Sequence, residues 1–150
     1  MQLGEVFINL WLQVRHLFEQ DDGSLPDIFI VNISHEQKMV IYEWLIEQCS
    51  VSKRDADNFR HRLIGLNYVG VELPEMTVCL AADELSLDYR MGVEWGEKAV
   101  TALFELLRQV YQISPQAIIF QADEGKSINP NVEFSQALEV YCLWKINEQA

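Results

Sequence analysis

Five carboxylates lie within fifteen residues of the chain, and they are the side chains best suited to chemistry. They are Asp83, Glu84, Asp88, Glu94 and Glu97. Two carboxylates held about 5–10 Å apart can act as general acid and general base, and one or two of them can bind Mg²⁺. Either role needs burial or convergence, which tunes the pKa of a carboxyl group. Because these side chains alternate along a predicted strand and around its turn, the pattern also allows a solvated face or a surface that contacts a partner protein.

Two aromatic residues among these carboxylates, Tyr89 and Trp95, favour the interpretation as a contact surface. Aromatic side chains surrounded by charged ones are typical of protein interfaces. Trp95 has an alternative role, because it is also the first inward-facing residue of a predicted helix and would then pack in the core. Asp123 and Glu124, in a polar loop, form the next acidic group and are a second candidate for partner contact.

The remaining reactive residues form no catalytic or cofactor-binding motif. The cysteines Cys49, Cys79 and Cys142 include no CxxC pair, and none of the three histidines belongs to an HExxH motif. Neither a glycine-rich phosphate-binding loop nor a GxSxG sequence is present. We therefore expect no metal, no cofactor and no catalytic residue. An odd number of cysteines in apolar surroundings indicates free thiols, and free thiols without a basic leader sequence favour a cytoplasmic protein.

The chain is strongly acidic, with 23 Asp and Glu against 11 Lys and Arg in 150 residues, a formal charge of -12. Small soluble domains carry a net charge of roughly 2–8. This excess argues against direct binding of nucleic acid or anionic lipid and favours a basic protein partner. No stretch of about 18 apolar residues occurs, so no membrane-spanning segment is expected. One basic island is interpreted as an exposed short helix that balances the acidic field; it contains Lys53, Arg54, Arg60, His61 and Arg62.

The periodicity of apolar residues predicts a single α+β domain with a mixed and partly antiparallel sheet packed against helices. Helices are predicted at about residues 2–20, 34–49, 55–64, 95–111 and from 135 onward. Strands are predicted at about residues 28–33, 69–73, 77–81, 85–90 and 118–120, with a hairpin over 77–90. Residues 28–33 are apolar on both faces, so this strand is expected in the interior of the sheet and buried on both sides. Ser34 and Gln37 have the spacing of a capping box at the start of the second helix.

The segment from Leu85 to Trp95 reads LSLDYRMGVEW and leads into the apolar helix that contains AVTALFELL, residues 99–107. A strand that ends in D-Y-R-x-G, followed by x-x-W and an apolar helix, resembles segments of small bacterial immunity proteins, which neutralise polymorphic or contact-dependent toxins. The match covers about 25 residues, and no toxin-contacting residue is carried over from it. The resemblance implies a non-enzymatic cytoplasmic inhibitor paired with one toxin, and many such toxins are basic nucleases.

The sequence therefore favours an acidic, non-enzymatic protein that binds a basic toxin domain and covers its active site. Its candidate contact residues are the five carboxylates, the two aromatic residues and the second acidic group named above. A nucleic-acid mimic that inhibits a defence protein has the same charge and differs only in its partner. A small metal-dependent hydrolase that uses the carboxylates between Asp83 and Glu97 is the alternative from a different functional class.

Overall fold

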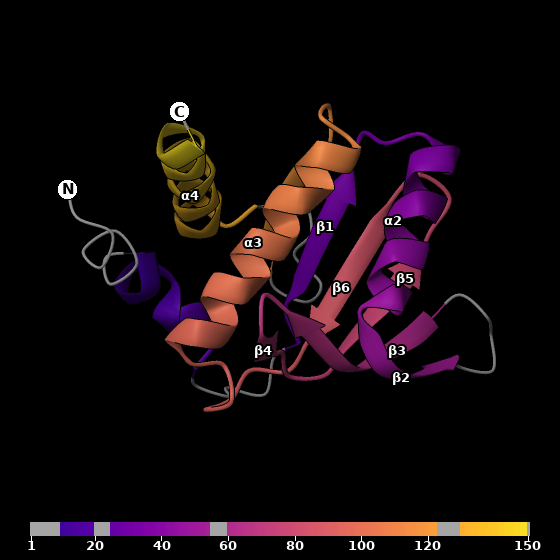
Figure 1. The fold of residues 1–150 in the computed structure, drawn as a ribbon, viewed down its shortest axis with the longest axis horizontal. Helices are drawn as coiled ribbons and strands as arrows, with labels where there is room; N and C mark the ends of the chain where they lie inside the picture. The colour runs from indigo at the N-terminus through magenta and orange to yellow at the C-terminus, as the bar shows by residue number, and fades with distance from the viewer. Residues whose placement is uncertain (1–9, 20–24, 55–59, 123–129, 150) are drawn as a thin grey trace.

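The computed structural model describes residues 10–19, 25–54, 60–122 and 130–149, and its main feature is an antiparallel sheet (Figure 1). The strands are β1 (Asp27–Val31), β2 (Cys49–Arg54), β3 (Arg60–Tyr68), β4 (Val71–Glu72), β5 (Met76–Leu80), β6 (Leu85–Tyr89) and β7 (Ile118–Ala122). Their order is β2-β3-β5-β6-β1-β7, and β4 pairs with the end of β3. Every pairing among these strands is antiparallel. The predicted single α+β domain is confirmed, and its described sheet is antiparallel throughout, where the sequence predicts a mixed and partly antiparallel one.

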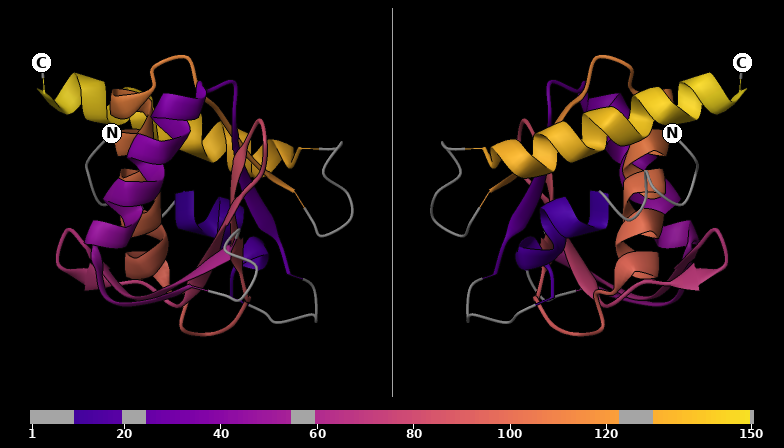
Figure 2. Two further views of the ribbon diagram at one scale, coloured as in Figure 1. Left: turned by 90° about the vertical axis from the view of Figure 1, so that its right-hand side faces the viewer. Right: turned by 90° about the vertical axis from the view of Figure 1, so that its left-hand side faces the viewer.

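Two long helices pack side by side against one face of this sheet (Figure 2). They are α2 (His35–Glu47) and α3 (Glu97–Ile113); α4 (Val132–Gln149) crosses beside α3 and β7. Residues 10–14 are helical and continue into η1 (Arg15–Leu17). The predicted capping box is present, because the Ser34 hydroxyl accepts the Gln37 N–H and the Gln37 side chain accepts the Ser34 N–H. Within the described ranges, no helix is long and apolar enough to cross a membrane.

Strand β1 lies between β6 and β7, in the interior of the sheet as predicted. Ile28 and Ile30 point into the core and are fully buried, whereas Phe29 and Val31 point to the opposite face and are half-buried. The prediction that this strand is buried on both sides is wrong, because α2 and α3 lie on the same face of the sheet. On the other face, which we call the open face, the rings of Phe29 and Phe120 stack with centroids 5.2 Å apart.

The helix predicted at residues 55–64 is also wrong, because residues 60–64 belong to strand β3; residues 55–59 lie outside the described part of the chain. Arg60 and Arg62 lie on the open face of β3 and alternate with the buried His61 and Leu63. Because His61 is polar as well, the sequence of this segment reads as a run of polar residues, and the alternation of exposed and buried residues typical of a strand is not apparent. At Gly65 the backbone is left-handed, with φ +67, so the alternation breaks and β3 buries residues on either side of this glycine.

The burial of Ile30 is testable by placing a charge there. Ile30→Asp should lower the free energy of unfolding by about 3 kcal/mol or more, because it buries an unpaired carboxylate. Ile118→Asp is the matched control, since it makes the same change on the neighbouring strand at a side chain that is 53% exposed. The control should cost less than about 1 kcal/mol. Chemical denaturation measures both variants, and equal losses would contradict the arrangement of the sheet.

The turn between β3 and β4 holds a valine in a conformation that favours glycine or asparagine. Val69 has φ +47 and the next residue, Gly70, has φ +80, which is the pattern of a type I′ hairpin turn. Val69 is 64% exposed, so its side chain contributes little burial in return. Val69→Asn should raise the free energy of unfolding by about 1 kcal/mol, because asparagine tolerates this backbone far better. In thermal denaturation, Val69→Asn should have a higher Tm than Val69→Ala. A lower Tm for Val69→Asn would contradict the type I′ turn.

Candidate functional site

The five carboxylates that the sequence singled out do not form one cluster. Asp83 and Glu84 lie in the turn before β6, whereas Glu94 and Glu97 lie beyond its other end. Strand β6 has five residues and is therefore about 17 Å long. Asp88, the fourth residue of β6, lies on the open face, where its carboxylate is 3.3 Å from the Arg60 guanidinium. The strand therefore holds Asp83 and Glu84 apart from Glu94 and Glu97, and the remaining carboxylate, that of Asp88, is paired with an arginine.

Tyr89 and Trp95 are core residues and are not available as anchors on the surface. Both side chains are almost completely buried, and both rings pack against Phe18, with centroid separations of 4.8 Å and 5.3 Å. The Tyr89 hydroxyl donates to the Leu17 carbonyl at 2.9 Å. The prediction that these aromatic side chains contact a partner is thus corrected, and the alternative role of Trp95 in the core is confirmed. They hold the N-terminal helical segment to the sheet.

The remaining predicted groups are dispersed or fall outside the described residues. Asp123 and Glu124 belong to residues 123–129, which the structure does not describe. In the described ranges, no group of three or more His, Cys, Asp or Glu side chains is placed to hold a metal ion. The basic island is partly neutralised on the open face, where Arg62 is 2.8 Å from the Glu75 carboxylate. His61 is buried, with its Nδ1 2.6 Å from the Tyr42 hydroxyl.

The three cysteines are free thiols, as predicted, and each is half-buried. Burial raises the pKa of the thiols of Cys49, Cys79 and Cys142. A thiol is nucleophilic only as the thiolate, so these positions suit packing better than nucleophilic catalysis.

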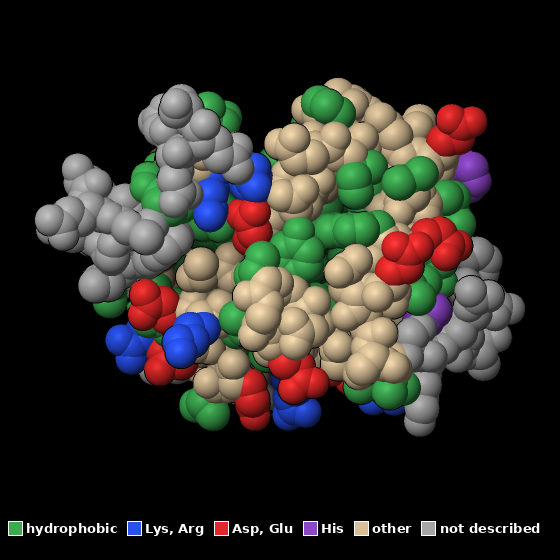
Figure 3. Space-filling model, viewed as in Figure 1, with side chains coloured by type: hydrophobic (Ala, Val, Ile, Leu, Met, Phe, Trp, Pro, Cys, Tyr) green, Lys and Arg blue, Asp and Glu red, His purple; other side chains and the backbone are tan. Residues whose placement is uncertain are grey.

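A different acidic surface lies on the outer side of α2, and we call it the α2 ridge. Its members, Glu36, Val40, Glu43 and Glu47, are all exposed. The spacing of four, three and four residues places them on one face of the helix, and the row from Glu36 to Glu47 spans about 17 Å. Within the described part of the chain, no cation pairs with these three carboxylates. Figure 3 shows acidic and hydrophobic side chains gathered where Figure 1 places α2.

Hydrophobic side chains form a shallow hollow beside the α2 ridge. Met39, Val40, Trp44 and Ile113 line it together with Glu43 and Glu47. Val40 is exposed and the other three apolar side chains are half-buried. An apolar centre bordered by charge is the usual composition of a protein-binding surface.

The sequence contains a signal for this ridge. In the helix predicted at about residues 34–49, glutamates at positions i, i+7 and i+11 share one face and could have identified it as an acidic surface.

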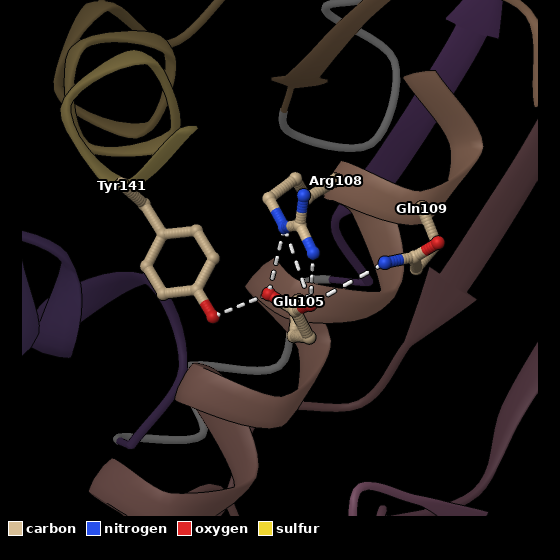
Figure 4. A network of polar contacts seen from close by, with 4 residues as sticks. All are labelled: Glu105, Arg108, Gln109 and Tyr141. Atoms are coloured by element: carbon tan, nitrogen blue, oxygen red, sulfur yellow. Dashed lines mark hydrogen bonds and ion pairs between the residues drawn. The ribbon is translucent and has the colours of Figure 1, made fainter. Parts of the chain in front are cut away.

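A second charged feature, the buried carboxylate of Glu105 on α3, is enclosed by hydrogen-bond donors (Figure 4). Only 8% of Glu105 is exposed. Arg108 approaches it with Nη2 at 2.7 Å and Nε at 3.0 Å, and Gln109 with Nε2 at 3.4 Å. From α4, the Tyr141 hydroxyl donates to the same carboxylate at 2.7 Å. Burial alone would raise the pKa of Glu105, but the hydrogen bonds from Arg108 and Tyr141 outweigh burial and lower it.

This network makes the stability of the protein depend on pH, because Glu105 titrates and the hydrogen bond from Tyr141 helps to lower its pKa. Tyr141→Phe removes one donor and should raise the pKa of Glu105. A carboxyl group whose pKa is lowered by folding stabilises the protein above its unfolded pKa, and this stabilisation is lost as the pH falls through the folded pKa. The variant should therefore be about 1–3 kcal/mol less stable at neutral pH, and the difference should shrink at pH values below about 4.

Urea unfolding at a series of pH values measures this effect. Glu105→Gln is the control, because it removes the titrating group, so the pH-dependent contribution of this site should disappear. A deficit of Tyr141→Phe that stays constant from neutral to acid pH would show that its hydroxyl does not act through the charge of Glu105.

Comparisons with known proteins do not assign the chain to a family. No protein-family model, no curated protein and no solved structure matches it. A proposal for its function therefore has to rest on the surfaces described above and on the sequence.

Proposed function

We propose that the protein binds a basic surface of another protein through the α2 ridge, and that this partner is a toxin domain whose activity it blocks. One observation carries the proposal: three exposed carboxylates, which pair with no cation among the described residues, line one face of α2 beside an apolar hollow. Carboxylates of this kind attract a basic partner, and the apolar side chains supply area to bury once contact is made.

The charge of the whole chain supports this mode of binding. A formal charge of -12 creates a field that draws basic proteins toward the surface and can raise association rates to about 10⁸–10⁹ M⁻¹s⁻¹ at low salt. On the open face, Asp88 and Glu75 are already paired with arginines. Where the structure describes the chain, the α2 ridge has no such pairing, so its charge is available to a partner.

The glutamates of the ridge are also poorly explained by the stability of the helix. Glu43 and Glu47 are like charges four residues apart, which destabilise a helix by about 0.2–0.5 kcal/mol. Glu47 is the last residue of α2, and the last turn contains no basic residue. A negative charge at the negative end of the helix dipole is unfavourable by about 0.3–1 kcal/mol. Residues that weaken their own helix and remain exposed favour a role in binding.

A toxin is the class of partner that the resemblance of residues 85–107 to immunity proteins favours. Many toxins of that kind are nucleases, and a nuclease must present Lys and Arg side chains to phosphate groups. An acidic helix with an apolar border suits such a cleft. Inhibition of this kind would take place in the cytoplasm, where free thiols such as those of this chain persist.

Substitutions on the ridge should separate binding from stability. Glu43→Gln with Glu47→Gln should leave the free energy of unfolding unchanged or raise it by up to about 1 kcal/mol, because both charges are unfavourable in the helix. The same variant should weaken partner binding and reduce its salt dependence, and Glu43→Lys with Glu47→Lys should weaken binding further, because it adds repulsion. The assay co-expresses this protein with the C-terminal domain of the protein that the gene immediately upstream encodes. It measures cell growth, complex formation and thermal stability.

The matched control is Asp83→Lys with Glu97→Lys, which makes the same change of charge at two other exposed positions. We expect the control to retain protection and most of the affinity. Loss of protection by the control but not by the α2 variants would move the contact to the ends of β6. Failure of any upstream-encoded domain to bind would refute the toxin partner.

A further inference from the structure

A groove of about 700 Å³ lies between the end of α3, strand β7 and α4. It is separate from the α2 ridge, because α3 stands between α4 and α2 (Figure 1). Ile119, Phe120, Leu138, Leu143 and Ile146 supply much of its apolar lining. This volume falls within the range of about 300–1,000 Å³ that is typical of small-molecule sites.

One wall of the groove, formed by α4, exposes apolar side chains to solvent. On α4, Leu143 and Ile146 are each more than half exposed although they line the groove. Burying such a side chain completely contributes about 1.5–3 kcal/mol. An apolar molecule in the groove would therefore gain free energy by covering these two residues.

Two side chains on α3 line the groove, and each keeps one N–H or O–H group that no described residue accepts. Arg108 and Tyr111 are three residues apart, so they lie on one face of the helix, and both line the groove. Arg108 uses Nε and Nη2 to bind Glu105, and among the described residues no acceptor contacts its Nη1. Figure 4 shows this third nitrogen directed away from Glu105. The Tyr111 hydroxyl lies near the Ile119 backbone N–H, and no residue in the described ranges accepts its hydrogen.

The charges around the groove define the head group that would suit these donors. Glu105 already neutralises Arg108, at 2.7 Å, and the chain as a whole carries a charge of -12. Among the described residues that line the groove, Arg108 is the only Lys or Arg side chain, so an anionic head group would meet this negative field with no second cation to balance it. A cationic head group would be repelled by the Arg108 guanidinium and would be attracted instead to the exposed carboxylate of Glu139 on α4, so it would not use the two donors. A neutral oxygen that accepts hydrogen bonds satisfies both donors without introducing a charge.

We propose that this groove binds a neutral, elongated apolar molecule with a carbonyl oxygen, of the kind formed by a long-chain ketone or ester. The carbonyl oxygen accepts hydrogen bonds from Arg108 and Tyr111, and the hydrocarbon chain covers Leu143 and Ile146. This site does not depend on the proposed protein partner, because the two surfaces share no residue.

The test uses the full chain and methyl octyl ketone, with decanoate and decylammonium as probes of the same chain length. Isothermal titration calorimetry should show saturable binding of one ketone, at least ten-fold tighter than that of either charged probe. Tyr111→Phe should weaken ketone binding about three- to ten-fold, the loss expected for one neutral hydrogen bond. Arg108 is left intact, because its removal would leave the Glu105 carboxylate buried without its cation.

A pair of variants on α4 locates the site. Ile146→Glu places a charge on the groove wall and should weaken ketone binding at least ten-fold. Val140→Glu makes the same kind of change on the same helix at a residue that does not line the groove, and it should bind like the parent. Bound ketone should also slow alkylation of Cys142, which lines the groove, and leave that of Cys49 unchanged.

Three results would overturn the proposal. The first is the absence of saturable ketone binding or of protection at Cys142. The second is equal affinity of the Ile146→Glu and Val140→Glu variants, which would place the ketone elsewhere. The third is binding of decanoate or decylammonium as tight as that of the ketone, which would show that the two donors do not select a neutral head group.

Discussion

The charge of Glu105 is the constraint on which the arrangement of α3 and α4 depends. A carboxylate buried in a protein is strongly destabilising unless a cation and hydrogen-bond donors surround it. Arg108 and Gln109 supply donors from the same helix as Glu105, and Tyr141 supplies the donor from α4. The aromatic ring of Tyr141 also packs against Phe104, so one side chain joins the polar and apolar parts of this contact. The position of α4 is thereby specified by a directional interaction as well as by hydrophobic packing.

This placement of α4 shapes the edge of the molecule. With Phe134, Ala137, Leu138 and Tyr141 turned toward the core, the neighbouring apolar side chains of the helix remain beside β7 and form a wall of the groove. The edge strand itself is partly closed, because the Gln121 carbonyl accepts the Asn131 N–H and Tyr111 contacts the Ile119 N–H. Bonds of this kind leave fewer free backbone groups for another strand to join. A molecule that binds at this edge would therefore contact side chains more readily than free backbone groups of β7.

The distribution of charge follows from the one-sided packing of the sheet. Arginines and carboxylates that alternate with core residues on β3 and β6 are brought together on the open face, where they pair. On the exposed side of α2, no cation of the described residues pairs with Glu36, Glu43 or Glu47. These glutamates lie on a helix, a rigid element that can present their charge to a basic partner.

Local patterns in the sequence were sufficient for the elements with a regular period. The capping box at Ser34, the β-branched run of β1 and the apolar stripe of α3 each predicted an element that the structure confirms. Local patterns could not reveal which face of an element becomes covered, since that depends on residues distant in the sequence. For this reason the sequence pattern predicts a helix over residues 60–64, the first part of β3 with its alternating arginines, and it predicts Tyr89 at the surface although Phe18 covers it.

The candidate surfaces show the same division between sequence and tertiary structure. Composition alone determined that the protein is acidic, because net charge does not depend on the fold, and this charge is one reason for proposing a basic partner. Only the tertiary structure decided which carboxylates lie together on one surface. Proximity in the sequence suggested that Asp83 and Glu97 belong to one cluster, but an extended strand rises about 3.3 Å per residue and carries its two ends apart. A helix rises only about 1.5 Å per residue and returns to the same face every three to four residues, so Glu36, Glu43 and Glu47 line one side of α2.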